Sequence, residues 1–461
     1  MKRILIILFL VILFLMLPAS TSYVTAQQTQ SDTARWLRSG PMLGYSEMTE
    51  TVVWLQTKKP SRVQVRFWKQ GQPATARLSD AIDTAAATDH IARVKISALE
   101  FGTKYDYEVY IDGLRVALAY AATFQTQPMW RWRTDPPAMK IAIGSCAYIN
   151  DPPYDRPGRP YGDGVEIFKA IADQKPDAMV WLGDNVYYRE ADWLAESGMR
   201  YRYAQNRELA ELQPLLASVH HYAIWDDHDF GPDDSDRTFR LRETALGVFK
   251  DYWANMTYGT DEAPGVFGRF EWGDVEFFLL DDRYHRAPNR MPPGPEKVMF
   301  GEAQMRWLLE SLASSKATFK IIAGGNQMLN PMTFFEAFGN YPAEQKRLLD
   351  FLREMKITGV LFISGDRHHT ELIKREDAGA YPLYDFTSSP LTAGTGRNER
   401  EAANPARVAN TWVTGVKNFG LIEVSGTSKD RRLLLRTIDL KGKELWRHEI
   451  KASELGVTAS R

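Results

Sequence analysis

The chain has 461 residues, of which 44% are hydrophobic and 25% are charged. This composition is typical of a globular protein with two or three domains, and it excludes disordered, collagen-like and coiled-coil proteins. The 57 basic and 58 acidic residues nearly balance, so no overall positive field would attract nucleic acid, and we expect no nucleic-acid partner. The single cysteine, Cys146, excludes an intramolecular disulfide.

The N-terminus has the pattern of an export signal. Lys2 and Arg3 precede an unbroken apolar run of 14 residues, Ile4 to Leu17, and small residues that end at Ala26 form a cleavage site. A helix of 14 residues spans about 21 Å, less than the ~30 Å core of a bilayer. We therefore expect a signal peptide over residues 1–26 and a mature protein exported to the periplasm, the cell surface or the medium, without a stable membrane anchor. An uncleaved anchor is the alternative.

Residues 28–130 are predicted to form a small β-sandwich. Val63, Val65 and Phe67 alternate with polar residues, and so do the apolar residues between Tyr105 and Ile111, which is the period of a half-buried strand. The segment around Tyr105 resembles the tyrosine-corner strand of fibronectin type III domains. Three prolines between Gln127 and Lys140 predict a linker after this sandwich.

Residues 139–455 are predicted to form an α/β domain, because short apolar segments alternate with amphipathic ones. The expected strands are Met139–Ile143, Ala178–Leu182, Tyr222–Trp225, Val275–Leu280, Phe319–Ala323 and Gly359–Ile363. The expected helices are Val165–Asp173, Glu208–Ser218, Ala303–Ser314 and Ala343–Met355. Three more strands are expected between Asn418 and Ile450.

Side chains that can bind metals follow five of these strands. Ligands of α/β folds collect at the carboxyl ends of strands. The segments are Gly144-Ser145-Cys146, Gly183-Asp184-Asn185, Asp226-Asp227-His228-Asp229, Gly324-Gly325-Asn326-Gln327 and Gly365-Asp366-Arg367-His368-His369. Each one taken singly also fits an ordinary turn or a helix cap. Burying so many carboxylates together is costly unless cations neutralise them, so the set predicts a multinuclear metal site.

The order of these motifs resembles that of a known family. Gly183-Asp184-x-x-Tyr187, Asp227-His228-Asp229 and Gly365-Asp366-x-His368 are similar to the motifs of calcineurin-like metallophosphoesterases. The Gly144-Ser145-Cys146 start and the Trp225-Asp226-Asp227-His228 centre resemble the alkaline phosphatase D (PhoD-like) family in particular. The resemblance implies an αββα metallophosphoesterase sandwich with the metals at strand ends, preceded by the fibronectin-III-like β-sandwich.

The resemblance also implies the metals and their ligands. Ferric iron (Fe3+) would be held by Cys146, Tyr187 and His368, with Asp184 bridging to a second metal position. The donors at that second position would be Asp184, Asp227, Asp366 and either Asn326 or Gln327. Because all of these donors are oxygens, they suit calcium (Ca2+), as one or two ions, better than zinc.

The implied reaction is hydrolysis of a phosphate ester by a metal-bound hydroxide. His228 would protonate the leaving alkoxide and Asp229 would orient its imidazole. Asn185 and Arg367 are candidates for phosphate binding, although Arg367 could instead pair with a neighbouring carboxylate, as could Arg283.

We therefore expect an exported phosphatase that acts on phosphate monoesters, diesters or both. An alternative within enzymes is a phosphodiesterase directed at phospholipid or teichoic acid, since an exported enzyme meets such polymers. A non-catalytic calcium-binding adhesion module is the alternative from another class, but such a module needs no general acid. A metallo-nuclease is disfavoured by the balanced charge.

Overall fold

The computed structural model describes residues 36–396 and 399–457. The predicted signal peptide, residues 1–26, lies outside these ranges. No helix in the described ranges has both the length and the apolar character that a membrane span requires.

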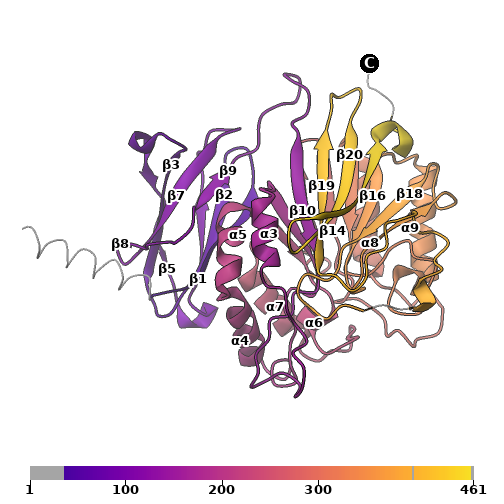
Figure 1. Ribbon diagram of the computed structural model, residues 1–461, viewed down its shortest axis with the longest axis horizontal. Helices are drawn as coiled ribbons and strands as arrows, with labels where there is room; N and C mark the ends of the chain where they lie inside the picture. Colours follow the sequence, from indigo (N-terminus) through magenta and orange to yellow (C-terminus); the bar gives the residue numbers. More distant parts are fainter. Residues whose placement is uncertain (1–35, 397–398, 458–461) are drawn as a thin grey trace, which may run out of the picture.

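The described residues form three β-sheets (Figure 1). The first has nine strands, in the order β21 (Glu444–Lys451), β20 (Arg432–Asp439), β19 (Asn418–Ser425), β10 (Met139–Gly144), β11 (Ala178–Leu182), β12 (His220–Ile224), β1 (Leu37–Ser46), β2 (Thr51–Thr57), β6 (Ile91–Ile96). The second has the order β13 (Gly268–Trp272), β14 (Val275–Leu279), β15 (Phe319–Ala323), β16 (Val360–Ser364), β18 (Leu383–Thr387), β17 (Glu371–Arg375). The third contains β4 (Arg77–Leu78), β3 (Arg62–Lys69), β7 (Lys104–Ile111), β8 (Leu114–Arg115), β5 (Ile82–Asp83), β9 (Thr123–Gln125).

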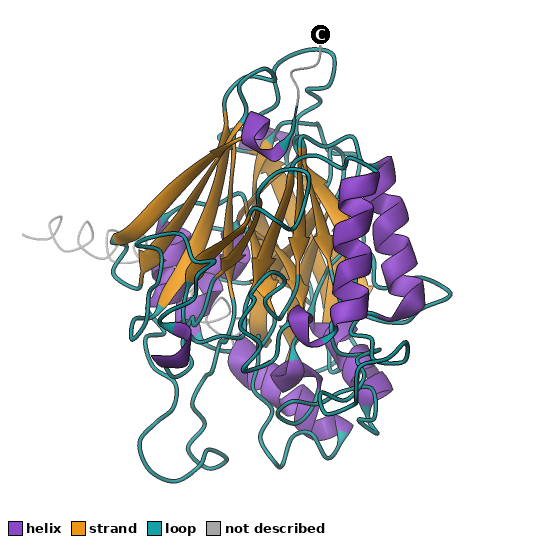
Figure 2. Cartoon of the chain, turned by 90° about the vertical axis from the view of Figure 1, so that its right-hand side faces the viewer, coloured by secondary structure: helices purple, strands orange, loops and turns teal. Residues whose placement is uncertain are grey.

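Helices cover the outer faces of the first two sheets. In Figure 2, α8 (Gly301–Ser314) and α9 (Pro342–Glu354) lie side by side against the second sheet. The first sheet packs against the helices α3 (Ile167–Asp173), α4 (Glu196–Arg207), α5 (Gln213–Ser218) and α7 (Arg242–Tyr252). The one-turn helix α6 (Asp227–Phe230) follows β12, and short 3-10 helices lie at Pro73–Thr75, Ala86–Thr88, Ala210–Leu212, Phe338–Asn340, Glu399–Glu401 and Ala452–Leu455.

The central strands β14, β15 and β16 of the second sheet are buried on both faces, which explains their largely apolar sequences. Phe277, Ile321 and Ile363 point into the core shared with the first sheet. Their neighbours in sequence point the other way, toward α8 and α9: Phe278, Ile322 and Phe362. Because successive side chains of a strand alternate between faces, one apolar run supplies both cores. The predicted αββα arrangement is thereby confirmed.

The N-terminal sandwich is continuous with the α/β region. Its core lies between β1-β2-β6 and the third sheet, and the backbone N–H of Glu100 donates to the Tyr105 hydroxyl at 2.9 Å, as in a tyrosine corner. However, β1 also pairs in parallel with β12, with Leu43 opposite His220. The expected linker, Gln127 to Lys140, runs from β9 of the third sheet to β10 of the first sheet. The first sheet itself contains strands from both predicted domains, because the edge of β12 pairs with β1.

Candidate metal centre and active site

Four of the predicted ligands stand on tight turns directly after strands. Cys146, Asp184, Asp366 and His368 follow β10, β11 and β16, and all four have positive φ, between 53° and 68°. Residues other than glycine seldom adopt this left-handed conformation, and such residues cluster at functional sites. These turns direct side chains from both sheets toward one place.

The first group of donors consists of Cys146, Asp184, Tyr187 and His368. Ligand atoms of Cys146, Asp184 and His368 lie within 4.8 Å of one another. The Tyr187 hydroxyl donates to Asp184 Oδ2 at 2.9 Å and lies 3.2 Å from His368 Nε2, while Cys146 Sγ lies 3.5 Å from Asp184 Oδ2. Ser389 donates its hydroxyl to Cys146 Sγ at 3.1 Å, which fixes the position of the sulfur. A thiol, a phenol, a carboxylate and an imidazole thus converge as the sequence predicts.

The electrostatics of this group fit a bound cation. Burial raises the pKa of the Cys146 thiol to about 11. Burial also raises the pKa of Asp184 well above its usual value, and Cys146 and Asp227 add to that effect. Each of these groups disfavours its own anionic form, because other acids surround it in a low-dielectric site. A cation would stabilise the thiolate, phenolate and carboxylate together, and this mixed donor set suits a transition metal.

A second group consists of Asp184, Asp227 and His228, whose ligand atoms also lie within 4.8 Å of one another. Asp366 lines the same pocket, and burial raises its pKa to about 7 although Arg367 opposes the shift. Asp184 belongs to both groups, which is the position that a bridging carboxylate requires. The carboxylates of the second group supply hard oxygen donors.

A third acidic group, Asp226, Asp227 and Glu336, differs in its charge balance. Arg283 Nε donates to Asp226 Oδ1 at 2.5 Å, and Arg283 also pairs with Glu336. Arg286 Nη2 donates to Glu336 Oε1 at 2.6 Å. Both guanidinium groups are fully buried. Two arginines thus face Asp226 and Glu336, although burial still raises the pKa of Asp226 well above its usual value. Asp227 is the residue that this group shares with the second group.

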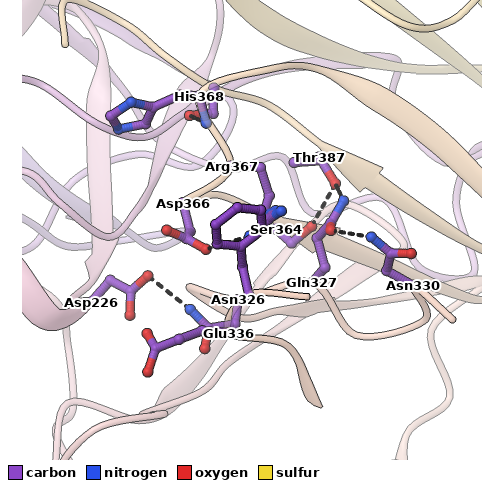
Figure 3. A network of polar contacts seen from close by, with 12 residues as sticks. Asp226, Asn326, Gln327, Asn330, Glu336, Ser364, Asp366, Arg367, His368 and Thr387 are labelled. Atoms are coloured by element: carbon purple, nitrogen blue, oxygen red, sulfur yellow. Dashed lines mark hydrogen bonds and ion pairs between the residues drawn. The ribbon is translucent and has the colours of Figure 1, made fainter. Parts of the chain in front are cut away.

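Asn326 and Gln327 do not reach the metal groups. The Asn326 amide donates to Asp226 Oδ2 at 3.0 Å, and its oxygen accepts from Arg286 at 2.8 Å. Gln327 donates to Thr387 Oγ1 at 2.8 Å (Figure 3), and its oxygen accepts from Asn330 at 2.6 Å. Both side chains are fully buried and neither lines the pocket. The prediction that one of them binds the second metal is corrected, since the oxygen of each is held by a neighbouring donor.

The structure also corrects the expected partner of His228. Asp229 accepts from the backbone N–H of Asp226 at 2.7 Å and from the Asn185 amide at 2.6 Å, as part of a capping box at the start of α6. The nearest carboxylate to His228 Nε2 is that of Asp233, at 3.6 Å, and the imidazole packs on the Tyr187 ring with centroids 4.2 Å apart. Asp229 therefore braces the turn that carries His228 instead of contacting the imidazole.

The two predicted phosphate-binding residues are engaged elsewhere. Asn185 donates its amide to the backbone oxygen of Ile224 at 2.7 Å as well as to Asp229, and it does not line the pocket. This position corrects its predicted role, because the amide ties two strand-end turns together. Arg367 does line the pocket, but it pairs with Glu401, in agreement with the alternative that it neutralises a carboxylate.

Asp184, Asp227, His228, Asp366 and His368 line a pocket of about 640 Å³. Its walls contain residues that the motifs did not indicate: Tyr161, Asp233, Asp234, Phe334, Phe335, Glu336, Glu401. Tyr161 contacts the metal groups through its hydroxyl, 3.2 Å from His368 Nδ1. Asp233 and Asp234 lie four and five residues after Asp229, the end of the Asp-His-Asp motif, so proximity in sequence was a signal for them. The other wall residues come from loops with no local motif.

Comparisons with known proteins agree with this geometry. A family described as PhoD-like phosphatase matches residues 142–433, and a domain family of unknown function matches residues 34–129. Alkaline phosphatase D of Bacillus subtilis is 23% identical over 323 residues, which cover 57% of this chain and 53% of that protein. The match thus spans about half the length of this relative.

Two solved structures share the fold. A PhoD structure superposes with a TM-score of 0.71 at 16% identity, covering 88% of this chain and 91% of the other. Purple acid phosphatase PPD1 from yellow lupin (Lupinus luteus) has a TM-score of 0.62 at 12% identity, covering 89% and 74% of the two chains. The family match extends over more than half of the chain and includes each strand-end motif described above, and on this basis the chain belongs to the PhoD-like phosphatase family.

Proposed function

We propose that this protein is an exported, metal-dependent phosphoesterase that hydrolyses phosphate monoesters, diesters or both. One observation carries the proposal: two donor groups share Asp184, and Asp184, Asp227, His228 and His368 from these groups line an open pocket. A pocket lined in this way attracts cations, and cations neutralise the phosphate oxygens that would otherwise repel a nucleophile. The family match supports the same reaction class.

The chemical types of the donor atoms support a proposal for which metal each group would hold. Cys146, Tyr187 and His368 would hold ferric iron, and Asp184 would bridge to calcium at Asp227 and Asp366. When bound, the metals would supply charge neutralisation and an acidified water for attack on phosphorus. Calcium fits the second position because its donors are oxygens, and an exported protein meets calcium at high concentration.

His228 is the residue that we propose as the general acid. It lines the pocket with its side chain 25% exposed, next to Asp233 at 3.6 Å. A proton held on its imidazole can pass to the leaving alkoxide, which accelerates such reactions about 10²- to 10⁴-fold. The hydrogen bond between Asn185 and Asp229 joins the turn after β11 to the turn after β12, so we propose both as positioning residues.

The iron assignment is tested by colour and metal content. Tyrosinate bound to ferric iron absorbs visible light, so the purified protein should be coloured and contain iron. Tyr187→Phe should lose the band. Tyr188→Phe is the matched control, because Tyr188 is equally buried and its hydroxyl has no hydrogen-bond partner in the described part of the chain. A colourless, iron-free and fully active preparation would overturn the assignment.

The calcium assignment is tested by chelation. A calcium-selective chelator should abolish hydrolysis of a generic aryl phosphate monoester and diester, and added calcium should restore it, whereas zinc should restore it poorly. Asp366→His should shift the preference toward zinc, because imidazole suits zinc. If turnover survives chelation and zinc raises it, calcium is not the second metal. A protein that binds both metals but hydrolyses neither ester would favour the calcium-binding adhesion module instead.

A further inference from the structure

The pocket that contains Asp184, Asp227 and His368 is larger than a phosphoryl group requires. Its volume of about 640 Å³ lies within the range of sites that enclose drug-sized ligands. Three aromatic side chains line it and remain open to solvent: Tyr161, Phe334 and Phe335, which are 46%, 51% and 52% exposed. Neighbouring exposed apolar residues beside polar groups are typical of ligand-binding grooves.

The loop that carries the two phenylalanines is anchored beneath the surface. Glu336, the next residue, is 9% exposed and pairs with the buried Arg283 and Arg286. Asn340 donates its amide to the backbone oxygen of Phe335 at 2.8 Å. Both contacts hold the C-terminal end of the exposed segment, and both phenylalanine rings line the pocket.

The Phe335 ring is held in addition by a cation. The guanidinium carbon of Arg367 lies 4.5 Å from the ring centroid, and Arg367 is itself paired with the fully buried Glu401. The guanidinium covers one face of the Phe335 ring, and about half of the side chain remains exposed to solvent. An aromatic ring fixed in this way offers a preformed apolar face at low entropic cost.

Tyr161 supplies an aromatic wall from a distant part of the sequence. Its hydroxyl lies 3.2 Å from His368 Nδ1, and its ring meets the edge of Tyr148 with centroids 4.9 Å apart. The pocket lining also includes the acidic side chains of Asp233, Asp234 and Glu401. Additional anionic groups of a substrate would be repelled there, whereas an uncharged ring would not.

We propose that Tyr161, Phe334 and Phe335 form a subsite for the organic group of the phosphate ester, which makes the enzyme prefer esters of aromatic or other bulky apolar alcohols over those of small or further phosphorylated alcohols. The proposal rests on the proposed phosphoesterase function. It names a substrate class, which the sequence motifs leave open. It also attributes the preference for the organic group to the two loops that carry Tyr161 and the phenylalanines, and not to the donors of the metal groups.

The test compares benzyl phosphate with methyl phosphate, whose leaving alkoxides have similar basicity. Phe335→Ala and Phe334→Ala should lower the ratio of kcat/KM for benzyl to methyl phosphate by about 3- to 10-fold, mainly through KM for the benzyl ester. Phe101→Ala is the matched control, because Phe101 is 51% exposed and does not line the pocket. It should leave both values unchanged. A ratio that does not move in either pocket variant overturns the subsite.

Binding separates failure of the subsite from failure of the function. Calorimetry with the metal-loaded protein should show that benzylphosphonate, which cannot be hydrolysed, binds more tightly than methylphosphonate, and Phe335→Ala should remove that difference. If the wild type shows this difference but hydrolyses neither ester, the function fails and the subsite stands. If it hydrolyses both esters and binds both phosphonates equally, the function stands and the subsite fails.

Discussion

Glu336 is the carboxylate on which the aromatic loop depends, and Glu336→Gln tests that dependence. Although burial opposes it, Arg283 and Arg286 hold the pKa of Glu336 below its usual value, so the side chain is charged at neutral pH. Arg286 has one carboxylate partner in the described part of the chain, Glu336. Removing that charge leaves a fully buried guanidinium uncompensated, which costs about 3–5 kcal/mol.

The assay is urea unfolding of the metal-loaded protein at neutral pH. Glu344→Gln is the control, because Glu344 is 6% exposed but accepts its hydrogen bonds from the backbone N–H groups of Met299, Phe300 and Gly301 instead of from arginines. It should lower the free energy of unfolding by only about 1–3 kcal/mol. Adding Arg286→Met to Glu336→Gln should recover part of the loss, since both charges are then removed. If Glu336→Gln costs no more than Glu344→Gln, the charge-balance reasoning is refuted.

Two further predictions concern histidines. His228→Ala should lower kcat by about 10²- to 10⁴-fold while the metals stay bound. The loss should be smaller for a substrate with an activated aryl leaving group, which needs less protonation. Metal content and kcat are measured on one sample, and loss of both together would make His228 a metal ligand instead. His220 is fully buried, and burial lowers its pKa to about 4 from 6.5. The unfolded chain therefore binds more protons between these values, so the stability present above pH 6.5 is lost as the pH falls toward 4, by up to about 3 kcal/mol. His220→Asn should flatten the urea stability curve in this window, and an unchanged slope would contradict the assignment.

The sequence predicts best those strands of the α/β region that are buried on both faces, whereas it gives no prediction for β13, β17 and β18. Ala178–Leu182 and Phe319–Ala323 are found with the predicted bounds, and the three C-terminal strands lie between Asn418 and Lys451. The local sequence pattern is sufficient to predict such strands, since each is a short apolar run between more polar segments. The pairing of β1 with β12 could not be predicted, because nothing in the local pattern of either strand encodes its partner across an edge.

At the site, too, the features that depend on local sequence are predicted and those that depend on distant segments are not. Cys146, Asp184, Tyr187 and His368 come together as predicted, because each follows a strand whose end points to the same edge. The position of Asp229 was missed although its signal was present: an Asp followed three residues later by an acid, as in Asp226 and Asp229, is typical of a capping box. The contacts of Asn326 with Arg286 and Asp226, and the place of the aromatic loop, depend on segments far apart in sequence.

Charge balance separates the acidic residues of this site into two kinds. Asp226 and Glu336 face Arg283 and Arg286, so the fold neutralises them with its own side chains. Burial and its acidic neighbours, Cys146 and Asp227 first among them, all oppose the charged form of Asp184. Of the two adjacent aspartates of the Trp-Asp-Asp-His motif, Asp226 accepts a hydrogen bond from Arg283, whereas Asp227 lies 3.8 Å from Arg283 and also belongs to the second donor group. Arg283 therefore contacts both aspartates as well as Glu336, the residue next to Phe335, so one buried guanidinium joins the proposed metal site to the loop of the proposed aromatic subsite.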